Sequence, residues 1–334
     1  MDTKLKTIVD KALSRRSFLA GAGAVAGATV IAGCGSNYSA PTTTTTTTTT
    51  YTVSDADILN FALNLEYLEA EFYLRAATGA GLSTADSGNS ASLTTGGAQV
   101  AGLTTVQQNY IYEIAQNELD HVRFLRSALG GSAVTAPAID LTNSFNGAAA
   151  AAGIGASFNP FATYQSFLVG AFVFEDVGVT AYHGAAGLLS TTATGKGYLS
   201  AAASILAVEA YHAAEIRTLL IADSVKNATT ASGMVTPNNT YIGYANKISA
   251  LRGTLGGGNE TAITPLPPYM TPFVPLAYMP ASSIVAADTT NSIAFARTTD
   301  QVLHIVYAAA PGAGVSKGGF FPSGLNGNIK VTAS

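Results

Sequence analysis

Four long stretches of this 334-residue chain repeat apolar residues at steps of three and four, and each carries a glutamate near the middle of its apolar side. That period is typical of amphipathic helices, which bury their apolar sides against one another. A linker of about 34 residues separates the second stretch from the third, which is enough to run the length of a helix bundle. The pattern therefore predicts an all-α four-helix bundle with a long crossover between helices 2 and 3. The predicted helices span about 54–78, 104–129, 164–189 and 197–226.

The glutamates are the unusual part of this pattern, because an unpaired buried carboxylate is costly. The first and third helices each contribute a glutamate to the predicted site, and in the second and fourth a histidine follows three residues after the glutamate. That spacing places both side chains on one helix face. One glutamate from each of two helices, with a Glu-x-x-His pair from each of the other two, is the ligand set of di-iron and di-manganese bundles. The predicted metal ligands are Glu66, Glu118, His121, Glu175, Glu209 and His212.

This ligand set contains carboxylates and imidazoles but no thiolate. Ligand hardness favours iron or manganese, although the general order of affinities favours copper or zinc. We therefore expect two iron or manganese ions as cofactors. The alternative without a metal is that these acids make salt bridges or capping contacts at the edge of the core.

Four residues near the predicted ligands have more than one interpretation. Glu69, three residues after the first ligand, is an extra ligand, an acceptor beside the ligands, or a solvated acid at the edge of the apolar side. Tyr73 and Tyr182 each follow a predicted ligand by seven residues. They donate to ligand carboxylates, supply an oxidisable ring, or simply pack in the core. Asp176 lies off the predicted ligand face and is expected beside the ligands or at the surface.

Composition excludes several classes of function. Charged residues make up only 11% of the chain and the net charge is -4, so there is no basic surface of the kind that binds nucleic acids. Cys34 is the only cysteine, which excludes an internal disulfide and a multi-cysteine zinc site. The composition is compatible with a homo-oligomer.

Residues 1–34 have the features of an export signal. The paired Arg15 and Arg16 precede an apolar run, rich in Gly and Ala, that is too short and small-sided for a membrane span. The segment resembles a twin-arginine (Tat) signal, which implies the Tat translocation machinery as a partner. Cys34 closes Ile31-Ala32-Gly33-Cys34, which is similar to the lipoprotein box whose cysteine is lipidated. The alternative is ordinary cleavage beside an incidental cysteine.

The segment 35–53 reads as a linker, because it contains nine consecutive threonines and has no means of burying an apolar face. A tether of this kind suits a domain attached to a membrane through lipidated Cys34. We therefore expect an exported periplasmic or cell-envelope lipoprotein of a bacterium.

The pattern changes after residue 227. Short helices are predicted over 241–255 and 299–309, and the prolines between 265 and 280 favour an extended strap. The expected organisation is a bundle over 54–227, wrapped by a Pro/Gly-rich C-terminal extension over 228–334.

Three segments carry a resemblance to a known family. Residues 63–73, Leu-Asn-Leu-Glu-Tyr-Leu-Glu-Ala-Glu-Phe-Tyr, resemble the opening helix of the ferritin-like domain in desiccation-related and stress-response proteins. Residues 295–303 and 318–327 are similar to the C-terminal signatures of that branch. The resemblance covers nearly all of 54–330 and implies a ferritin-like bundle whose metal ligands fall on the six residues named above. One departure is the long first link, which places Glu66 and Glu118 52 residues apart, against 34 for Glu175 and Glu209.

The resemblance and the ligand set together suggest a redox-active di-metal oxidoreductase. It would act on peroxide or dioxygen and protect the cell envelope during stress. The main alternative is a non-catalytic desiccation-related or stress-related structural protein tethered at the envelope. Iron storage is a third interpretation, but it requires a closed shell of many subunits, with which a lipid tether and a long extension fit poorly.

Overall fold

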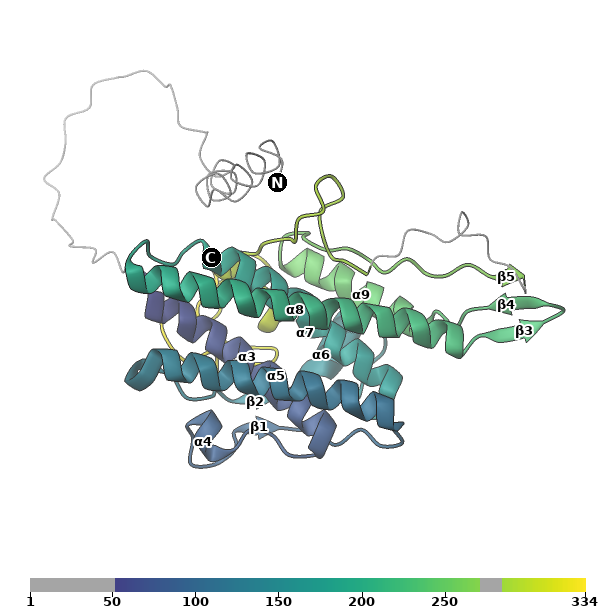
Figure 1. Cartoon of the computed structure of the whole chain (residues 1–334), viewed down its shortest axis with the longest axis horizontal. Helices are drawn as coiled ribbons and strands as arrows, with labels where there is room; N and C mark the ends of the chain where they lie inside the picture. Colours follow the sequence, from purple (N-terminus) through teal and green to yellow (C-terminus); the bar gives the residue numbers. More distant parts are fainter. Residues whose placement is uncertain (1–51, 271–283) are drawn as a thin grey trace, which may run out of the picture. The chain divides into compact units, whose positions relative to one another are not determined.

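Four long helices run alongside one another in the part of the chain that the structure describes (Figure 1). The structure is a computed structural model, and it describes residues 52–270 and 284–334. The long helices are α3 (Asp55–Thr78), α5 (Thr105–Leu129), α7 (Tyr164–Ala186) and α8 (Ala193–Lys226). They pack as two pairs, α3 with α5 and α7 with α8, so the predicted all-α four-helix bundle is confirmed. The predicted export signal, with Arg15, Arg16 and Cys34, and the threonine-rich linker up to residue 51 lie outside the described residues.

Side-chain caps explain where these helices begin. Ser54 and Thr104 each accept a hydrogen bond from the backbone three residues on, and the side chain at that position accepts one from the cap's own N–H. These two capping boxes start α3 and α5 within a residue of the predicted positions. The helix predicted from residue 197 begins instead at Ala193, because Thr192 accepts a hydrogen bond from the N–H of Gly195. The helix predicted to reach residue 189 ends at Ala186.

The two long links are pinned to each other. The link between α3 and α5 contains α4 (Thr84–Ser87) and β1 (Thr94–Thr95). The crossover between α5 and α7 contains the 3₁₀ helix η1 (Gly130–Ser132), β2 (Ile139–Asp140) and α6 (Asn143–Ala151). β1 and β2 pair in parallel, and the N–H of Val100 donates to the carbonyl of Ala76 at 3.0 Å. The long first link is therefore anchored to the bundle, and α3 and α5 pack against each other in spite of its length.

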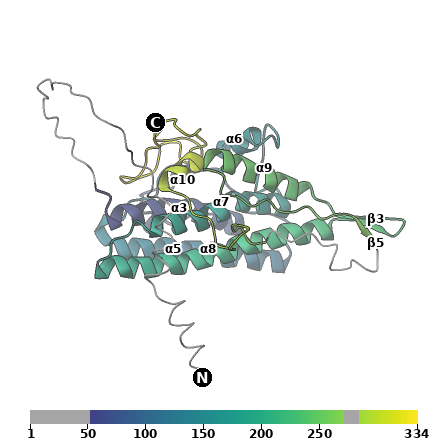
Figure 2. The same cartoon turned by 90° about the horizontal axis from the view of Figure 1, so that it is seen from above.

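The C-terminal extension covers one side of the bundle. It contains the hairpin β3 (Thr229–Ala231) and β4 (Met234–Thr236), then α9 (Thr240–Leu255), β5 (Tyr269–Met270) and α10 (Thr299–Val306). β5 pairs antiparallel with β4. Figure 2 shows α3 and α7 lying between α5 and α8 on one side and α9 and α10 on the other. As a result α3 and α7 are buried almost all round, whereas α5 buries a narrow stripe. The prolines at 272, 275 and 280 lie outside the described residues.

A cluster of aromatic side chains forms part of the core between these layers. The ring of Phe72 lies at its centre, with the ring centroids of Phe145, Phe161, Phe167 and Phe174 at 5.2 to 5.8 Å from it. Aromatic rings at these separations pack favourably beyond the area they bury. No helix among the described residues is both long enough and apolar enough to cross a membrane.

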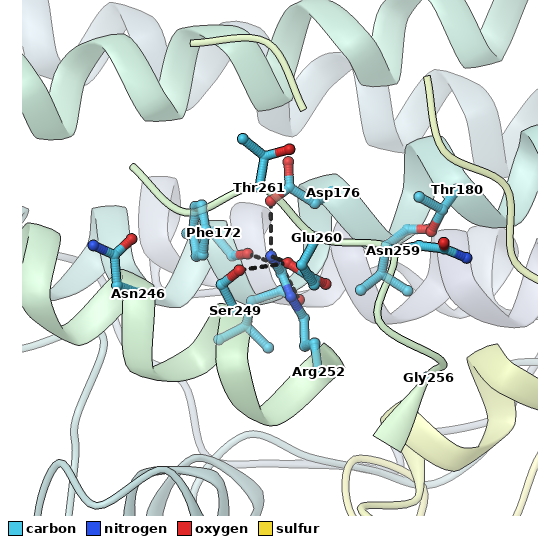
Figure 3. Close-up of polar contacts among 12 residues, drawn as sticks. Phe172, Asp176, Thr180, Asn246, Ser249, Arg252, Gly256, Asn259, Glu260 and Thr261 are labelled. Atoms are coloured by element: carbon cyan, nitrogen blue, oxygen red, sulfur yellow. Dashed lines mark hydrogen bonds and ion pairs between the residues drawn. The ribbon is translucent and has the colours of Figure 1, made fainter. Parts of the chain in front are cut away.

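A buried ion network fastens the extension to the bundle (Figure 3). Arg252 of α9 lies 2.7 Å from Asp176 of α7 and 2.7 Å from Glu260. Asp176 also pairs with Arg217 of α8, and Glu260 pairs with Arg297 at 2.6 Å. Burial would raise the pKa of Asp176, but the two guanidinium groups outweigh burial and lower it. Asp176 is therefore a buried partner of this network, not a surface acid.

Candidate metal centre

The structure brings the six predicted ligand residues together in the middle of the bundle. They come from all four long helices, one glutamate each from α3 and α7 and a Glu-x-x-His pair each from α5 and α8. All six side chains are buried, with exposed fractions from 0% for Glu66 to 9% for His121. Because positions i and i+3 lie on one helix face, both side chains of each Glu-x-x-His motif point into the same site.

The two imidazoles divide the site into two halves. The Nδ1 atom of His121 lies 3.2 Å from Oε2 of Glu66, 3.4 Å from Oε2 of Glu118 and 3.6 Å from Oε1 of Glu209. The Nδ1 atom of His212 lies 2.9 Å from Oε1 of Glu118 and 3.7 Å from Oε2 of Glu175. Glu118 thus turns one oxygen toward each histidine.

These contacts define two groups of candidate ligand atoms. One group takes an atom each from Glu66, Glu118, His121 and Glu209, and the other takes one each from Glu118, Glu175 and His212. Within each group the atoms lie within 4.8 Å of one another. Because Glu118 belongs to both groups, the arrangement suits two cations that share one carboxylate.

Most of the polar atoms in this region make no hydrogen bond. Among the described residues, ten buried side-chain nitrogen or oxygen atoms have no hydrogen-bond partner, and eight of them belong to these six residues. Buried polar atoms nearly always have a partner, because an unsatisfied one costs about 1–3 kcal/mol. A cluster of unsatisfied carboxylate and imidazole atoms, facing one another, is the donor set that a pair of divalent cations would satisfy. The residues present therefore fit a two-metal site.

Two tyrosines each donate a hydrogen bond to one of the end glutamates, Glu66 and Glu175. Tyr73 of α3 donates to Oε1 of Glu175, and Tyr182 of α7 donates to Oε1 of Glu66. Each tyrosine therefore contacts an end glutamate on the other helix pair. The Oε2 atom of that glutamate still faces a histidine. Among the interpretations of these tyrosines, donation to the carboxylate of a predicted ligand is the one that the structure shows.

Comparison with known proteins agrees with this geometry. Residues 54–222 match the family model of the ferritin-like domain. The chain belongs to the ferritin-like domain family. It is 30% identical over 289 residues to the ferritin-like catalase Nec2 of Nesocodon mauritianus, covering 83% of this chain and 85% of that protein. It is 32% identical over 266 residues to the desiccation-related protein PCC13-62 of Craterostigma plantagineum, covering 77% and 79%. The predicted membership of the desiccation-related ferritin-like branch is confirmed.

Protonation differs strongly among the clustered groups of this ferritin-like protein. Burial raises the pKa of Glu66 to about 7 and the pKa of Glu175 to about 8. Burial acts on Glu118 in the same direction, but the two histidines outweigh it and lower its pKa to about 2. Burial would lower the pKa of a histidine, yet the neighbouring carboxylates raise the pKa of His121 to about 11 and that of His212 to about 9. Without a metal, protons balance the charge, and metal binding would release them.

Glu69 lies beside the ligand cluster but outside both groups of ligand atoms. It is buried, with 5% of its surface exposed, and it lines a cavity together with Ile305, Val306 and Phe320 of the extension. The interpretation of Glu69 as a solvated acid is therefore wrong. Burial and the charges of nearby ligand glutamates raise its pKa well above the usual range.

Two further residues shape the site, and neither was singled out from the sequence. Oδ1 of Asn117 lies 3.0 Å from Nε2 of His212, which turns Nδ1 of that ring toward the carboxylates. The residue before Glu209 is Val208, so the second Glu-x-x-His pair has no equivalent asparagine. Gly178 of α7 faces Glu209 so closely that an added Cβ would overlap Oε2 of that glutamate.

Proposed function

We propose that this ferritin-like protein is a redox-active di-metal protein that disproportionates hydrogen peroxide into water and dioxygen. The observation that carries the proposal is the set of eight unsatisfied atoms on six buried ligand residues. The relative named a ferritin-like catalase, 30% identical over most of both chains, supports peroxide as the substrate. Reduction of dioxygen by the same centre is the related reaction to test beside it.

Each residue of the site has a defined task in this proposal. When bound, two iron or manganese ions supply the two-electron oxidation and reduction that peroxide disproportionation requires. Glu118 offers one oxygen to each half of the site, and each histidine serves one half. Tyr73 and Tyr182 fix the orientation of the end glutamates. Burial of the whole set keeps bulk water away from the reacting atoms.

Oxygen evolution tests the reaction directly. Peroxide added to protein loaded with iron or manganese should release dioxygen, and Glu118→Ala and His121→Ala should each abolish the release. Glu113→Ala is the matched control, because Glu113 is an exposed glutamate on the same helix. Loaded wild-type protein that evolves no dioxygen would rule out peroxide disproportionation.

Metal analysis tests the cofactor separately. Protein purified without added metal should contain close to two equivalents of iron or manganese, and the Glu118→Ala protein should contain much less. Zinc alone, or no metal in freshly purified protein, would contradict the proposed cofactor.

A second candidate function is a non-catalytic role in desiccation or stress. The 32% identity to a desiccation-related protein over 77% of this chain favours it. In that case the Glu118→Ala and His121→Ala proteins melt at a lower temperature than the metal-loaded wild-type protein, and the wild-type protein shows no turnover. Oxygen evolution and melting temperature, measured on the same samples, separate the two functions.

We also propose that the protein is exported by the Tat machinery and held at the cell envelope through lipidated Cys34. The support is the pair Arg15 and Arg16, the apolar run that follows and the position of Cys34. Replacing both arginines with lysine should retain the protein in the cytoplasm. Cys34→Ala should release it from membrane fractions without blocking export.

A further inference from the structure

A small cavity lies on the side of the metal centre that the extension covers. Its walls come from α3, α7 and α10 and from the ring of Phe320. The outer wall consists of Ile305, Val306 and Phe320, and the inner wall includes Glu69 and Gly178. Glu69 is the only residue with an ionisable side chain among those that line the cavity.

The inner wall of this cavity borders the metal centre. An added Cβ at Gly178 would overlap Oε2 of Glu209 and would lie 3.3 Å from Oε1 of Glu69. Because Gly178 has no side chain, little separates the cavity from the carboxylate of a predicted ligand. A molecule in the cavity would therefore lie next to the centre.

The size and lining of the cavity restrict what it can hold. Its volume is about 20 Å³, enough for one water-sized molecule, which needs about 10–15 Å³. Hydrogen peroxide is slightly larger than water and carries two O–H donors. Glu69 lines the cavity, and an oxygen of its carboxyl group can accept a hydrogen bond from such a donor. The apolar walls leave no room for the alkyl group of an organic hydroperoxide.

We propose that this cavity is the entry route to the metal centre for neutral molecules no larger than hydrogen peroxide, with Glu69 as the residue that positions the peroxide. The inference rests on the proposed function for the identity of the substrate. The route itself is a property of the cavity and can be measured without turnover.

The route is tested by nitric oxide, a neutral diatomic that binds ferrous iron with a colour change. Val306→Phe fills the cavity from α10, away from the ligand-bearing helices, and should slow nitric oxide association with the iron-loaded protein by about tenfold or more. Leu303→Ala is the control, because Leu303 is buried on the same helix and does not line the cavity. Equal association rates in the wild-type and Val306→Phe proteins, at equal iron content, would overturn the route.

Selectivity is tested by enlarging the cavity. Ile305→Ala should raise the ratio of tert-butyl hydroperoxide to hydrogen peroxide turnover by about tenfold, whereas Leu303→Ala should leave it unchanged. An unchanged ratio in Ile305→Ala would overturn the assignment of the cavity as the size filter. If no peroxide is turned over while Val306→Phe still slows nitric oxide, the proposed function fails and the route stands.

The role of Glu69 is tested by two substitutions. Glu69→Leu removes the acceptor and should raise the KM for peroxide more than it lowers kcat, while nitric oxide association stays fast. Glu69→Gln keeps a carbonyl oxygen and should restore most of the affinity. If Glu69→Leu leaves the KM unchanged, or if Glu69→Gln is as impaired as Glu69→Leu, Glu69 does not position the peroxide.

Discussion

At the scale of single residues, the tyrosines that hold the end glutamates are the clearest test of how the site is organised. Tyr73 and Tyr182 each donate to one oxygen of a glutamate on the other helix pair. Hydrogen bonds of this kind orient metal ligands, and their loss typically lowers metal affinity about 10–100-fold. We expect Tyr73→Phe and Tyr182→Phe to weaken binding by that amount, measured by titration against a competing chelator.

Tyr67→Phe is the matched control for these variants. Tyr67 is a fully buried tyrosine of the same helix as Tyr73, but it donates to the carbonyl of Val134 and contacts no ligand. Metal affinities that are equal in the three Phe variants would show that the two site tyrosines only fill space.

The pKa values of the metal-free site predict how its stability depends on pH. The pKa values of Glu66 and Glu175 rise from 4.5 to about 7 and 8, and that of His212 rises from 6.5 to about 9. These groups hold protons more tightly in the folded chain than in the unfolded chain. The stability they contribute is therefore present at low pH and lost as the pH rises from about 5 to 9. Metal replaces these protons, so the rise in melting temperature on loading should be larger at pH 8 than at pH 5.5.

Thermal melts of loaded and chelator-treated protein across this range measure the effect. Glu118 has its pKa lowered to about 2 and stays ionised throughout the range, so it does not contribute to the trend. The Glu118→Ala protein should show no gain from metal at either pH. A gain that is constant between pH 5.5 and 8 would contradict the proton displacement.

The sequence could predict which six side chains meet, because their spacing follows the helix repeat. It could not predict Asn117 or Gly178, since both depend on how closely two helices approach. Asn117 lies on α5 and contacts a histidine of α8 that is 95 residues away. No local pattern marks such a contact.

At the scale of the elements, the buried ion network predicts a large loss of stability on removal of one partner. Asp176 pairs with Arg217 and Arg252, both of which are nearly inaccessible to solvent. Asp176→Asn keeps the shape but leaves three buried arginines with Glu260 as the remaining acid of the network. Removing one partner of a buried ion pair costs about 3–5 kcal/mol, and we expect that loss in the free energy of unfolding measured with urea.

Asp86→Asn provides the comparison for this prediction. Asp86 pairs with Arg123, whose side chain is 52% exposed, and exposed pairs contribute about 0–1 kcal/mol. Similar losses in the two variants would mean that the network adds little beyond a surface ion pair.

The difference between local patterns and long-range contacts explains which elements could be predicted from the sequence. The four long helices have many apolar repeats and recognisable caps, so their positions follow from local sequence. The strands β1 and β2 have two residues each and exist because the two long links meet. The loop residue Glu260 joins Arg252 and Arg297 only after α9 has packed on α7. Tertiary contacts of this kind leave no periodic signal in the sequence.

At the scale of the whole molecule, buried polar side chains of α3 fasten the end of the chain to the bundle, and Asn64 makes two of these hydrogen bonds. Asn64 of α3 is fully buried, donates to the carbonyl of Asn326 at 2.9 Å and accepts from its N–H at 3.0 Å. Asn64→Ala would leave both backbone groups of Asn326 unpaired, at about 1–3 kcal/mol each. We expect a loss of about 2–4 kcal/mol in the free energy of unfolding, whereas Asn109→Ala, on the exposed face of α5, should have little effect.

The form of the unfolding transition tests how the extension is coupled to the bundle. Residues 52–334 form one compact unit, tied together by Asn64, by the ion network and by α10 on α7. We therefore expect the extension and the bundle to unfold in one cooperative transition, observed at the same temperature by metal release and by circular dichroism. An early transition that frees the C-terminal residues while the metal stays bound would show that the bundle holds its centre without the extension. In that case the extension would serve as the outer wall of the cavity and not as a support for the ligands.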